Sequence, residues 1–170
     1  MRRGVRQRAA PAVPGRIQLL VLDVDGVLTD GRLWFSDRGE ALKAFHVRDG
    51  HGIKQLRSHG VRIAVISGRR SAAVLRRCRE LGITIVVQSA ADKLAALARI
   101  ARRLRIPLDR CACVGDDSPD VAVMKAVGLA FAVADAHGDA RHAAHYLTAL
   151  GGGNGAVREV CDWLVAQTAS

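Results

Sequence analysis

The chain has 170 residues, of which 49% are hydrophobic and 25% are charged, and its formal net charge is +10 at pH 7. A chain of this length can bury about 70% of its unfolded surface in one domain, so it needs neither disulfides nor structural metals to fold. No apolar run approaches the roughly 20 residues of a membrane span. We therefore expect a soluble protein with no membrane partner.

The positive charge is partly concentrated at the N-terminus. Arg2, Arg3, Arg6 and Arg8 lie in the segment MRRGVRQRAAPAVPGR, residues 1–16, which we expect to be a disordered arm before a single domain at 17–170. The arm lacks the apolar segment of a signal peptide. No RNA-binding aromatic pattern or helix-turn-helix signal accompanies the charge, so we expect no nucleic-acid partner. A basic field that attracts an acidic small molecule explains the charge better.

The four cysteines, Cys78, Cys111, Cys113 and Cys161, lack the paired spacing of a zinc site. Cys111 and Cys113 fall on one face of a predicted buried strand. We interpret all four as reduced core residues of a cytoplasmic protein, because disulfides are rare in that compartment.

After residue 16, short apolar runs alternate with helical patterns. The predicted strands are Ile17–Val24, Val61–Ser67, Ile83–Gln88, Arg110–Gly115, Leu129–Val133 and His145–Thr148. The predicted helices are Gly50–Ser58, Ser71–Leu81, Asp92–Leu104, Asp120–Val127, Gly138–Ala144 and Ala156–Ala166. This alternation predicts an α/β fold, a doubly wound, Rossmann-like parallel sheet with helices on both faces.

One segment interrupts the alternation. Gly31–Val47, GRLWFSDRGEALKAFHV, has two β-like halves around Asp37–Glu40 and predicts a small β-hairpin inserted after the first strand. Gly39 suits the positive φ of a short hairpin loop. The insertion is too small for a cap domain, so we expect no large cap. A second unusual segment, GGGNG at Gly151–Gly155, predicts a flexible turn before the last helix.

Polar residues follow several predicted strands on the same side of the alternation. In LLVLDVDGVLTDG, Asp23 and Asp25 stand at the end of an apolar strand, where an unpaired charge would be costly. In an open doubly wound sheet, the carboxyl ends of the strands meet in one crevice. The same crevice would receive Ser67 with Gly68 and Arg69, then Lys93, then Asp116 with Asp117.

Acids at two strand ends, a hydroxyl and a lysine together indicate a site for a divalent metal and a phosphate. Carboxylate oxygens suit a hard cation such as Mg²⁺, while lysine and backbone N–H groups suit phosphoryl oxygens. Each motif alone is commonly a turn, a helix cap or a solvated lysine. Because all of them follow apolar strands on one side, we favour a single shared site.

The motifs DVDGVLTDG from Asp23, ISGR ending in Arg69, Lys93, and GDDSPD ending in Asp120 resemble the ordered motifs of the haloacid dehalogenase superfamily of phosphatases. The segments GEALKAFHVRDGHGIKQL, VGDDSPDVAVMKAVGLAFAVADAH and GGGNGAVREVCDWL resemble the 3-deoxy-D-manno-octulosonate 8-phosphate phosphatase family across almost all of Ile17–Leu164. The resemblance implies a Mg²⁺-dependent hydrolase that releases phosphate from this sugar-acid phosphate in lipopolysaccharide precursor synthesis.

The resemblance also implies catalytic roles. Asp23 is the expected nucleophile, which attacks phosphorus and forms an aspartyl-phosphate intermediate. Asp25 is the expected general acid toward the leaving sugar oxygen and the expected base toward water. Ser67 and Lys93 would hold the phosphoryl oxygens, with Lys93 stabilising charge in the transition state.

The metal site implied by the resemblance uses the same carboxylates. Mg²⁺ would be held by Asp23, by the backbone carbonyl of Asp25 and by Asp116, with water completing the octahedron. Asp117 and Asp120 would orient the lysine or the metal shell without binding the metal directly.

The sugar-binding positions of the family carry over as well. Guanidinium groups suit a sugar acid because they bind carboxylate in a bidentate fork. His46 stands where Asn is frequent, and Lys54 stands where Arg is frequent. Asn154 also stands where Arg is frequent, which reduces charge contacts from the C-terminal segment, so we leave that segment out of the site. The implied substrate-binding residues are Asp25, His46, Val47, Arg48, Asp49, Gly50, Lys54, Arg69, Arg77 and Lys93.

In the resembled family, the hairpins assemble a tetramer in which each crevice is covered by a neighbouring subunit. Leu33, Trp34 and Phe35 fit this assembly, since an apolar cluster on a short hairpin would otherwise be exposed. The resemblance therefore implies a homotetramer built through Gly31–Val47. The alternative is that these side chains pack on their own domain.

Two other functions stay open. A response-regulator receiver domain is also doubly wound, but its acid pair follows the first strand and its phosphorylated Asp follows the third, whereas here the DD pair comes late. Among enzymes, phosphatases for nine-carbon sialic-type acid 9-phosphates share the motifs and the hairpin. One methylol unit changes few contacts, so the motifs do not separate the two sugars.

Overall fold

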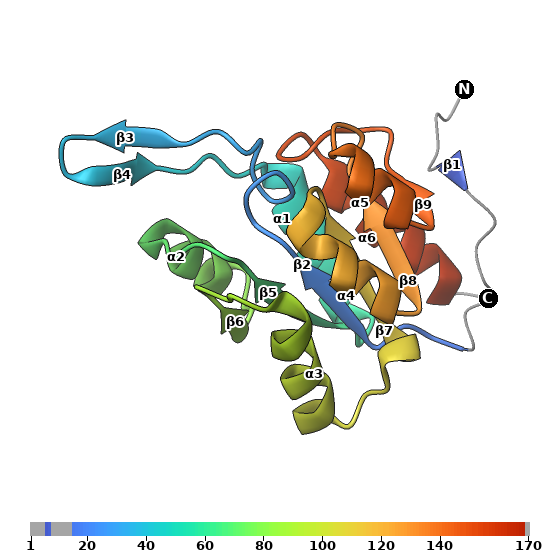
Figure 1. Cartoon of the computed structure of the whole chain (residues 1–170). Coiled ribbons are helices and arrows are strands. Elements are labelled where there is room, and N and C mark those ends of the chain that lie inside the picture. The colour runs from blue at the N-terminus through green and yellow to red at the C-terminus, as the bar shows by residue number, and fades with distance from the viewer. Residues whose placement is uncertain (1–5, 8–14, 169–170) are drawn as a thin grey trace.

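The computed structural model describes residues 6–7 and 15–168, and a seven-stranded sheet forms its centre (Figure 1). The strands lie in the order β1-β9-β8-β7-β2-β5-β6. Six of them run parallel, and β1 pairs antiparallel with β9 at one edge. Their bounds are β1 (Arg6–Gln7), β2 (Leu19–Leu22), β5 (Arg62–Ile66), β6 (Ile85–Val87), β7 (Cys111–Gly115), β8 (Leu129–Ala132) and β9 (Tyr146–Leu147).

Helices cover both faces of the sheet. Helix α1 packs against α2 and α6 on one face, while α4 contacts α3 and α5 on the other (Figure 1). The bounds are α1 (Val47–Ser58), α2 (Ala72–Glu80), α3 (Lys93–Leu104), α4 (Val121–Ala126), α5 (Gly138–Ala143) and α6 (Ala156–Thr168), with short 3-10 helices η1 (Leu108–Arg110) and η2 (Ser118–Asp120). The predicted doubly wound α/β fold is confirmed. None of the described helices is long and apolar enough to cross a membrane.

Strand β2 occupies the centre of the sheet because its residues are apolar on both faces. Leu19, Leu20 and Leu22 are fully buried, and β2 pairs with β5 on one side and with β7 on the other. In this register Leu22 lies opposite Val65 and Val114. The three strands therefore end close together, which gathers the polar residues that follow them.

The core between sheet and helices contains the four cysteines and an aromatic cluster. The ring of Phe131 stacks on Tyr146 at 5.3 Å and meets the edge of Trp163 at 5.5 Å, which ties β8, β9 and α6 together. All four cysteines are free and buried. Burial raises the pKa of Cys78 to about 11, so this thiol stays protonated at neutral pH. The prediction of unpaired core cysteines is confirmed.

Helix α1 begins at Val47, before the predicted start at Gly50. The reason is His46, whose ring Nδ1 accepts a hydrogen bond from the amide of Arg48 at 3.2 Å and caps the helix. Histidine is not among the preferred cap residues, which are Ser, Thr, Asp and Asn. The earlier start therefore has no clear signal in the sequence.

The predicted hairpin is present and projects away from the sheet (Figure 1). Strands β3 (Trp34–Ser36) and β4 (Gly39–Leu42) pair antiparallel, and Gly39 has the positive φ of +105° that this turn requires. Trp34 and Phe35 are 52% and 63% exposed, so the alternative that they pack on their own domain is wrong. Within residues 15–168 the hairpin is the largest insertion, and no large cap is present.

The N-terminal arm is described only in part. Arg6–Gln7 form the short edge strand β1, with Arg6 opposite Leu147, although the sequence predicts no regular structure in residues 1–16. The rest of that prediction concerns residues 1–5 and 8–14, which lie outside the described residues.

The segment GGGNG is closely packed and does not form the flexible turn that its composition predicts. A Cβ on Gly152 would lie 1.8 Å from the carbonyl oxygen of Gly26, and the amide of Gly153 donates to the carbonyl of Val27 at 2.9 Å. The Asp135 carboxylate accepts a hydrogen bond from the amide of Gly152 at 2.9 Å. The glycines therefore permit close support of the loop that follows β2.

Asp49 is a buried residue with a structural contact. It is 2% exposed, and its Oδ1 accepts a hydrogen bond at 2.8 Å from the amide of Arg158 in the first turn of α6. Burial raises the pKa of Asp49, while hydrogen bonds from the amides of Arg158 and Gly155 act in the opposite direction. Asp49 thus caps α6 from α1 and joins the two helices.

Replacing Asp49 with Ala should lower the free energy of unfolding by about 1–3 kcal/mol, because amides at the start of α6 would lose their acceptor. Chemical denaturation measures the loss. Asp162→Ala is the matched control, since this exposed carboxylate pairs with Arg158 on the same helix and should contribute less than about 0.5 kcal/mol. Equal losses in the two variants would contradict the capping role.

Candidate active site

A cleft of about 850 Å³ lies at the carboxyl ends of β2, β5 and β7. Its walls come from the loops that follow these strands and β6, from η2 and from the starts of α3 and α4. The lining residues are Asp23, Asp25, Gly31, Ser67, Gly68, Arg69, Ala90, Ala91, Asp92, Lys93, Leu94, Asp116, Asp117, Ser118, Pro119, Asp120 and Ala122. All the residues predicted to be catalytic or metal-binding therefore meet in one cleft.

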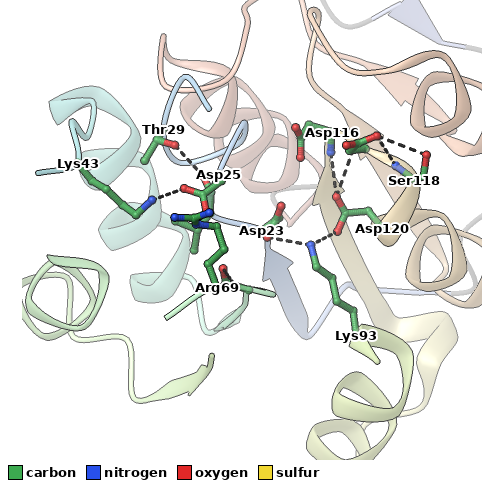
Figure 2. A network of polar contacts seen from close by, with 12 residues as sticks. Asp23, Asp25, Thr29, Lys43, Arg69, Lys93, Asp116, Ser118 and Asp120 are labelled. Atoms are coloured by element: carbon green, nitrogen blue, oxygen red, sulfur yellow. Dashed lines mark hydrogen bonds and ion pairs between the residues drawn. The ribbon is translucent and has the colours of Figure 1, made fainter. Parts of the chain in front are cut away.

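Lys93 links two of the acids in this cleft (Figure 2). Its Nζ lies 2.9 Å from Oδ1 of Asp23 and 2.7 Å from Oδ1 of Asp120, and its side chain is 9% exposed. Burial lowers the pKa of Lys93, but the charges of the two carboxylates outweigh burial and raise the pKa above its usual value. Lys93 is therefore a fixed, charged group at the floor of the cleft.

Asp120 holds both the lysine and the loop after β7. While Oδ1 pairs with Lys93, Oδ2 accepts hydrogen bonds from the amides of Asp116 at 3.1 Å and Asp117 at 3.4 Å. Gly115 allows this approach, because a Cβ there would lie 2.5 Å from the Cβ of Asp120. These contacts support the expectation that Asp120 orients its neighbours.

Three carboxylates form a compact cluster of hard oxygen donors. One ligand atom from each of Asp23, Asp116 and Asp120 lies within 4.8 Å of the others. Burial, and after it the charges of Asp23 and Asp120, raise the pKa of Asp116 to about 8. Burial and the charge of Asp120 also raise the pKa of Asp23 to about 6, although Lys93 opposes the shift. This excess of negative charge fits a divalent cation.

Gly26 lets Asp116 approach the loop after β2. Its φ is +85°, and a Cβ on Gly26 would lie 2.0 Å from Oδ2 of Asp116. Any other residue would therefore combine an unfavourable backbone conformation with displacement of the carboxylate. Because Gly152 packs against the Gly26 carbonyl from the opposite end of the chain, the C-terminal loop also supports the metal-ligand candidates.

Asp25 is held by two cations that reach it from different elements (Figure 2). Lys43, directly after β4, forms an ion pair with Oδ1 of Asp25, and Nε of Arg69 lies 3.6 Å from Oδ2. Sequence reasoning missed Lys43, because a lysine beside an exposed hairpin is normally solvated, whereas this side chain is 1% exposed. The sequence feature that could have identified Lys43 is its position in GEALKAFHV, a segment that carries the family resemblance.

The loops after β5 and β6 are tied together and form one wall of the cleft. Ser67 is 3% exposed, and its Oγ accepts a hydrogen bond from the amide of Arg69 at 3.2 Å. Gln88 donates to the Ser71 carbonyl at 3.0 Å and accepts from the Ser71 amide at 3.3 Å. Gln88 does not line the cleft, but its two hydrogen bonds hold the loop after β5 against the end of β6.

Asp117 points to a different set of partners from Asp120. Its Oδ1 accepts a hydrogen bond from the amide of Ser118 at 2.7 Å and lies 3.8 Å from Nδ1 of His137. Its side chain is exposed, and no contact with Lys93 is present among the described residues. The expected orienting role toward the lysine therefore rests on Asp120.

The predicted sugar-binding residues divide into two groups. Asp25, Arg69 and Lys93 line the cleft, whereas the others lie on α1, on its cap and on α2. Arg77 packs over Gly50, where a Cβ would lie 2.3 Å from its Nη2. The residues that do not line the cleft of their own chain are His46, Val47, Arg48, Asp49, Gly50, Lys54 and Arg77.

Known proteins are similar to this chain in sequence over most of its length. A family model described as haloacid dehalogenase-like hydrolase matches residues 84–159. The 3-deoxy-D-manno-octulosonate 8-phosphate phosphatase of Escherichia coli strain K12 is 48% identical over 149 residues, which cover 88% of this chain and 79% of that protein. The protein of the same name from Yersinia pestis is 46% identical over 161 residues, covering 95% of this chain and 83% of that protein.

Solved structures agree with these relatives. A crystal structure of 3-deoxy-D-manno-octulosonate 8-phosphate phosphatase from Yersinia pestis superposes with a TM-score of 0.88 at 45% identity, covering 90% of this chain and 83% of that one. The Moraxella catarrhalis phosphatase, in complex with magnesium ion, phosphate ion and a KDO molecule, has a TM-score of 0.86 at 42% identity, covering 88% and 86%. The chain belongs to the 3-deoxy-D-manno-octulosonate 8-phosphate phosphatase family, within the haloacid dehalogenase-like hydrolases.

Proposed function

We propose that this chain is a Mg²⁺-dependent phosphatase that converts 3-deoxy-D-manno-octulosonate 8-phosphate into the free sugar acid and phosphate, in lipopolysaccharide precursor synthesis. The observation that carries this function is one cleft holding the acids, Ser67 and Lys93 in a chain 48% identical to a phosphatase for this ester. The receiver-domain alternative is wrong, because relatives matching almost the whole chain are hydrolases. The named relatives also favour the eight-carbon sugar acid over the nine-carbon alternative.

Asp23 is the nucleophile in this proposal. Its carboxylate oxygen forms a bond to phosphorus while the bond from phosphorus to the sugar oxygen breaks, which leaves an aspartyl-phosphate. The position of Lys93, 2.9 Å from Asp23, supports a role in holding the phosphoryl oxygens as their charge shifts. Ser67 lies in the same cleft and would hold a further phosphoryl oxygen.

Asp25 is the general acid and base in this proposal. It donates a proton to the departing sugar oxygen and then takes one from the water that attacks the aspartyl-phosphate. Attack by water releases phosphate and restores the Asp23 carboxylate. The place of Asp25 in the cleft, two residues after the nucleophile, supports this role because it faces the same reacting centre.

Asp23, Asp116 and the backbone carbonyl of Asp25 would hold Mg²⁺. The clustered oxygen donors support the fit, and so do the pKa values of Asp23 and Asp116, which are raised first by burial and then by neighbouring carboxylates. When bound, Mg²⁺ neutralises charge between the carboxylates and the phosphoryl group. Both oxygens of Asp120 are already engaged by Lys93 and by amides, which supports an orienting role over ligation.

We further propose that residues 17–170 work as one domain, in the cytoplasm, within a homotetramer built through the hairpin. The exposed side chains of Trp34 and Phe35 support this assembly, because a monomer would leave them in water. Val47, Arg48 and Lys54 support it too, since they are exposed outside their own cleft and a neighbour could receive them. Asp49 and Gly50 are buried within their own chain.

Asp23→Asn should reduce phosphate release by about a thousandfold or more, because an amide is a poor nucleophile but keeps the shape of the side chain. The release of phosphate from the sugar-acid phosphate measures it, with circular dichroism as the check on folding. Asp109→Asn is the control, since this exposed acid lies before β7, at the opposite end of the strand from the cleft. Parent-level turnover by folded Asp23→Asn would overturn the mechanism.

In the metal-free chain, stability should fall as pH rises from about 4 to about 8. The folded-state pKa values of Asp116, about 8, and Asp23, about 6, exceed the unfolded value of about 3.9. Between these values the folded chain keeps protons that the unfolded chain has lost. The resulting stabilisation is full below about pH 4 and is lost as pH passes the folded-state pKa values.

Thermal denaturation in the presence of a chelator measures this loss, and added Mg²⁺ should restore the midpoint at high pH. Asp116→Asn should flatten the pH dependence, because it removes the group with the larger shift. Asp109→Asn should leave the dependence unchanged. Identical pH profiles for the parent chain and Asp116→Asn would contradict the proposed cluster of repelling carboxylates.

Replacing both Trp34 and Phe35 with Asp should dissociate the tetramer, because burying unpaired charges in an interface costs about 2 kcal/mol or more. Turnover of the sugar-acid phosphate should drop at least about tenfold, while the small ester para-nitrophenyl phosphate should be much less affected. Sedimentation and rates on both substrates measure the result. Ala98→Asp with Arg102→Asp, both exposed on α3, is the control. A folded monomer with the parent rate on the sugar would refute the idea.

A further inference from the structure

Lys43 is a buried cation that the catalytic proposal above does not use. Its side chain is 1% exposed, although the residue follows an exposed hairpin strand. Burying an ammonium group is costly unless an anion pairs with it. The anion is Asp25, which accepts a hydrogen bond from Nζ of Lys43 through Oδ1 (Figure 2).

The two oxygens of Asp25 lie in different surroundings. Oδ1 pairs with the buried Lys43, whereas Oδ2 lies 3.6 Å from Arg69, whose side chain is 44% exposed. Asp25 and Arg69 line the cleft, and Lys43 does not. Lys43, outside the cleft, therefore holds Oδ1 of Asp25, while Oδ2 lies beside Arg69 of the cleft wall.

We propose that Lys43 is a positioning residue for Asp25, which fixes the carboxyl group so that Oδ2 exchanges protons with the leaving-group oxygen and with water. This inference rests on the acid and base role proposed for Asp25. An aspartate side chain has two rotatable bonds, and an anchored oxygen removes orientations that point away from the reacting atoms. Arg69 alone cannot supply the anchor, because it is exposed and more distant.

The step that depends on this orientation is leaving-group departure. As the bond from Asp23 to phosphorus forms, the bond from phosphorus to the ester oxygen breaks, and the proton on Asp25 moves to that oxygen. An alkoxide needs this proton, whereas a nitrophenolate is stable without it. Misplacement of Asp25 should therefore slow esters of alcohols far more than esters of nitrophenol.

Lys43→Met tests the inference, because Met keeps most of the side-chain volume and removes the charge. The two probes are para-nitrobenzyl phosphate and para-nitrophenyl phosphate, which are similar in size and lack the sugar but differ in leaving group. Measured as kcat/KM, which reports steps up to leaving-group departure, Lys43→Met should lose at least about tenfold on the benzyl ester and less than about threefold on the phenyl ester.

Lys125→Met is the matched control, since Lys125 is exposed on α4 and does not line the cleft; it should change neither rate. Sedimentation and thermal midpoints must match those of the parent, and Lys43→Gln replaces Lys43→Met if the latter does not fold. Equal losses on the two esters, or no loss on either, would overturn the positioning role, because a purely structural defect does not distinguish leaving groups.

Asp25→Asn separates this inference from the function on which it rests. If Asp25→Asn loses the benzyl ester selectively and Lys43→Met does not, the acid role stands and the positioning role falls. If Asp25→Asn shows no selectivity, the acid role itself is wrong. Selective loss in both variants, larger in Asp25→Asn, is the expected result.

Discussion

The ammonium group of Lys93 joins the parts of the site, and it can do so only because of the register of the sheet. It lies 2.9 Å from Asp23, which follows β2, and 2.7 Å from Asp120, which ends η2 after β7. The pairing of Leu22 with Val114 brings these two strand ends together. Side chains alternate along a strand, so a slip of one residue would turn Asp23 to the other face and break the bridge.

One lysine does not balance the three carboxylates around it. Asp23, Asp116 and Asp120 are close enough to repel each other, and burial removes the water that would screen them. The chain keeps this arrangement through glycines at Gly26 and Gly115, which admit the carboxylates to within distances that a Cβ would block. The stability of the rest of the fold offsets this repulsion, and a bound divalent cation would neutralise the excess negative charge.

Much of the fold and of the cleft was predictable, because its signals are local. The apolar run that forms β2, the acids after it and Lys93 behind the Asp92 cap all fall within short windows of sequence. The missed features depend on contacts between distant residues. Asp49 caps a helix that begins more than 100 residues later, and Gly152 supports Gly26 across a similar separation. No local pattern distinguishes these residues from an ordinary polar residue and an ordinary loop glycine.

The two directions of the hairpin chain face different surroundings. Adjacent residues of an extended chain point in opposite directions, and here Leu42 is 53% exposed while the side chain of Lys43 is 1% exposed. The outward direction leaves an apolar side chain exposed, and the inward direction places an ammonium group on Asp25. Movement of the hairpin would therefore shift a group that contacts Asp25 in the loop after β2. A site completed by other subunits and oriented through the same hairpin would couple assembly to chemistry without any dedicated domain.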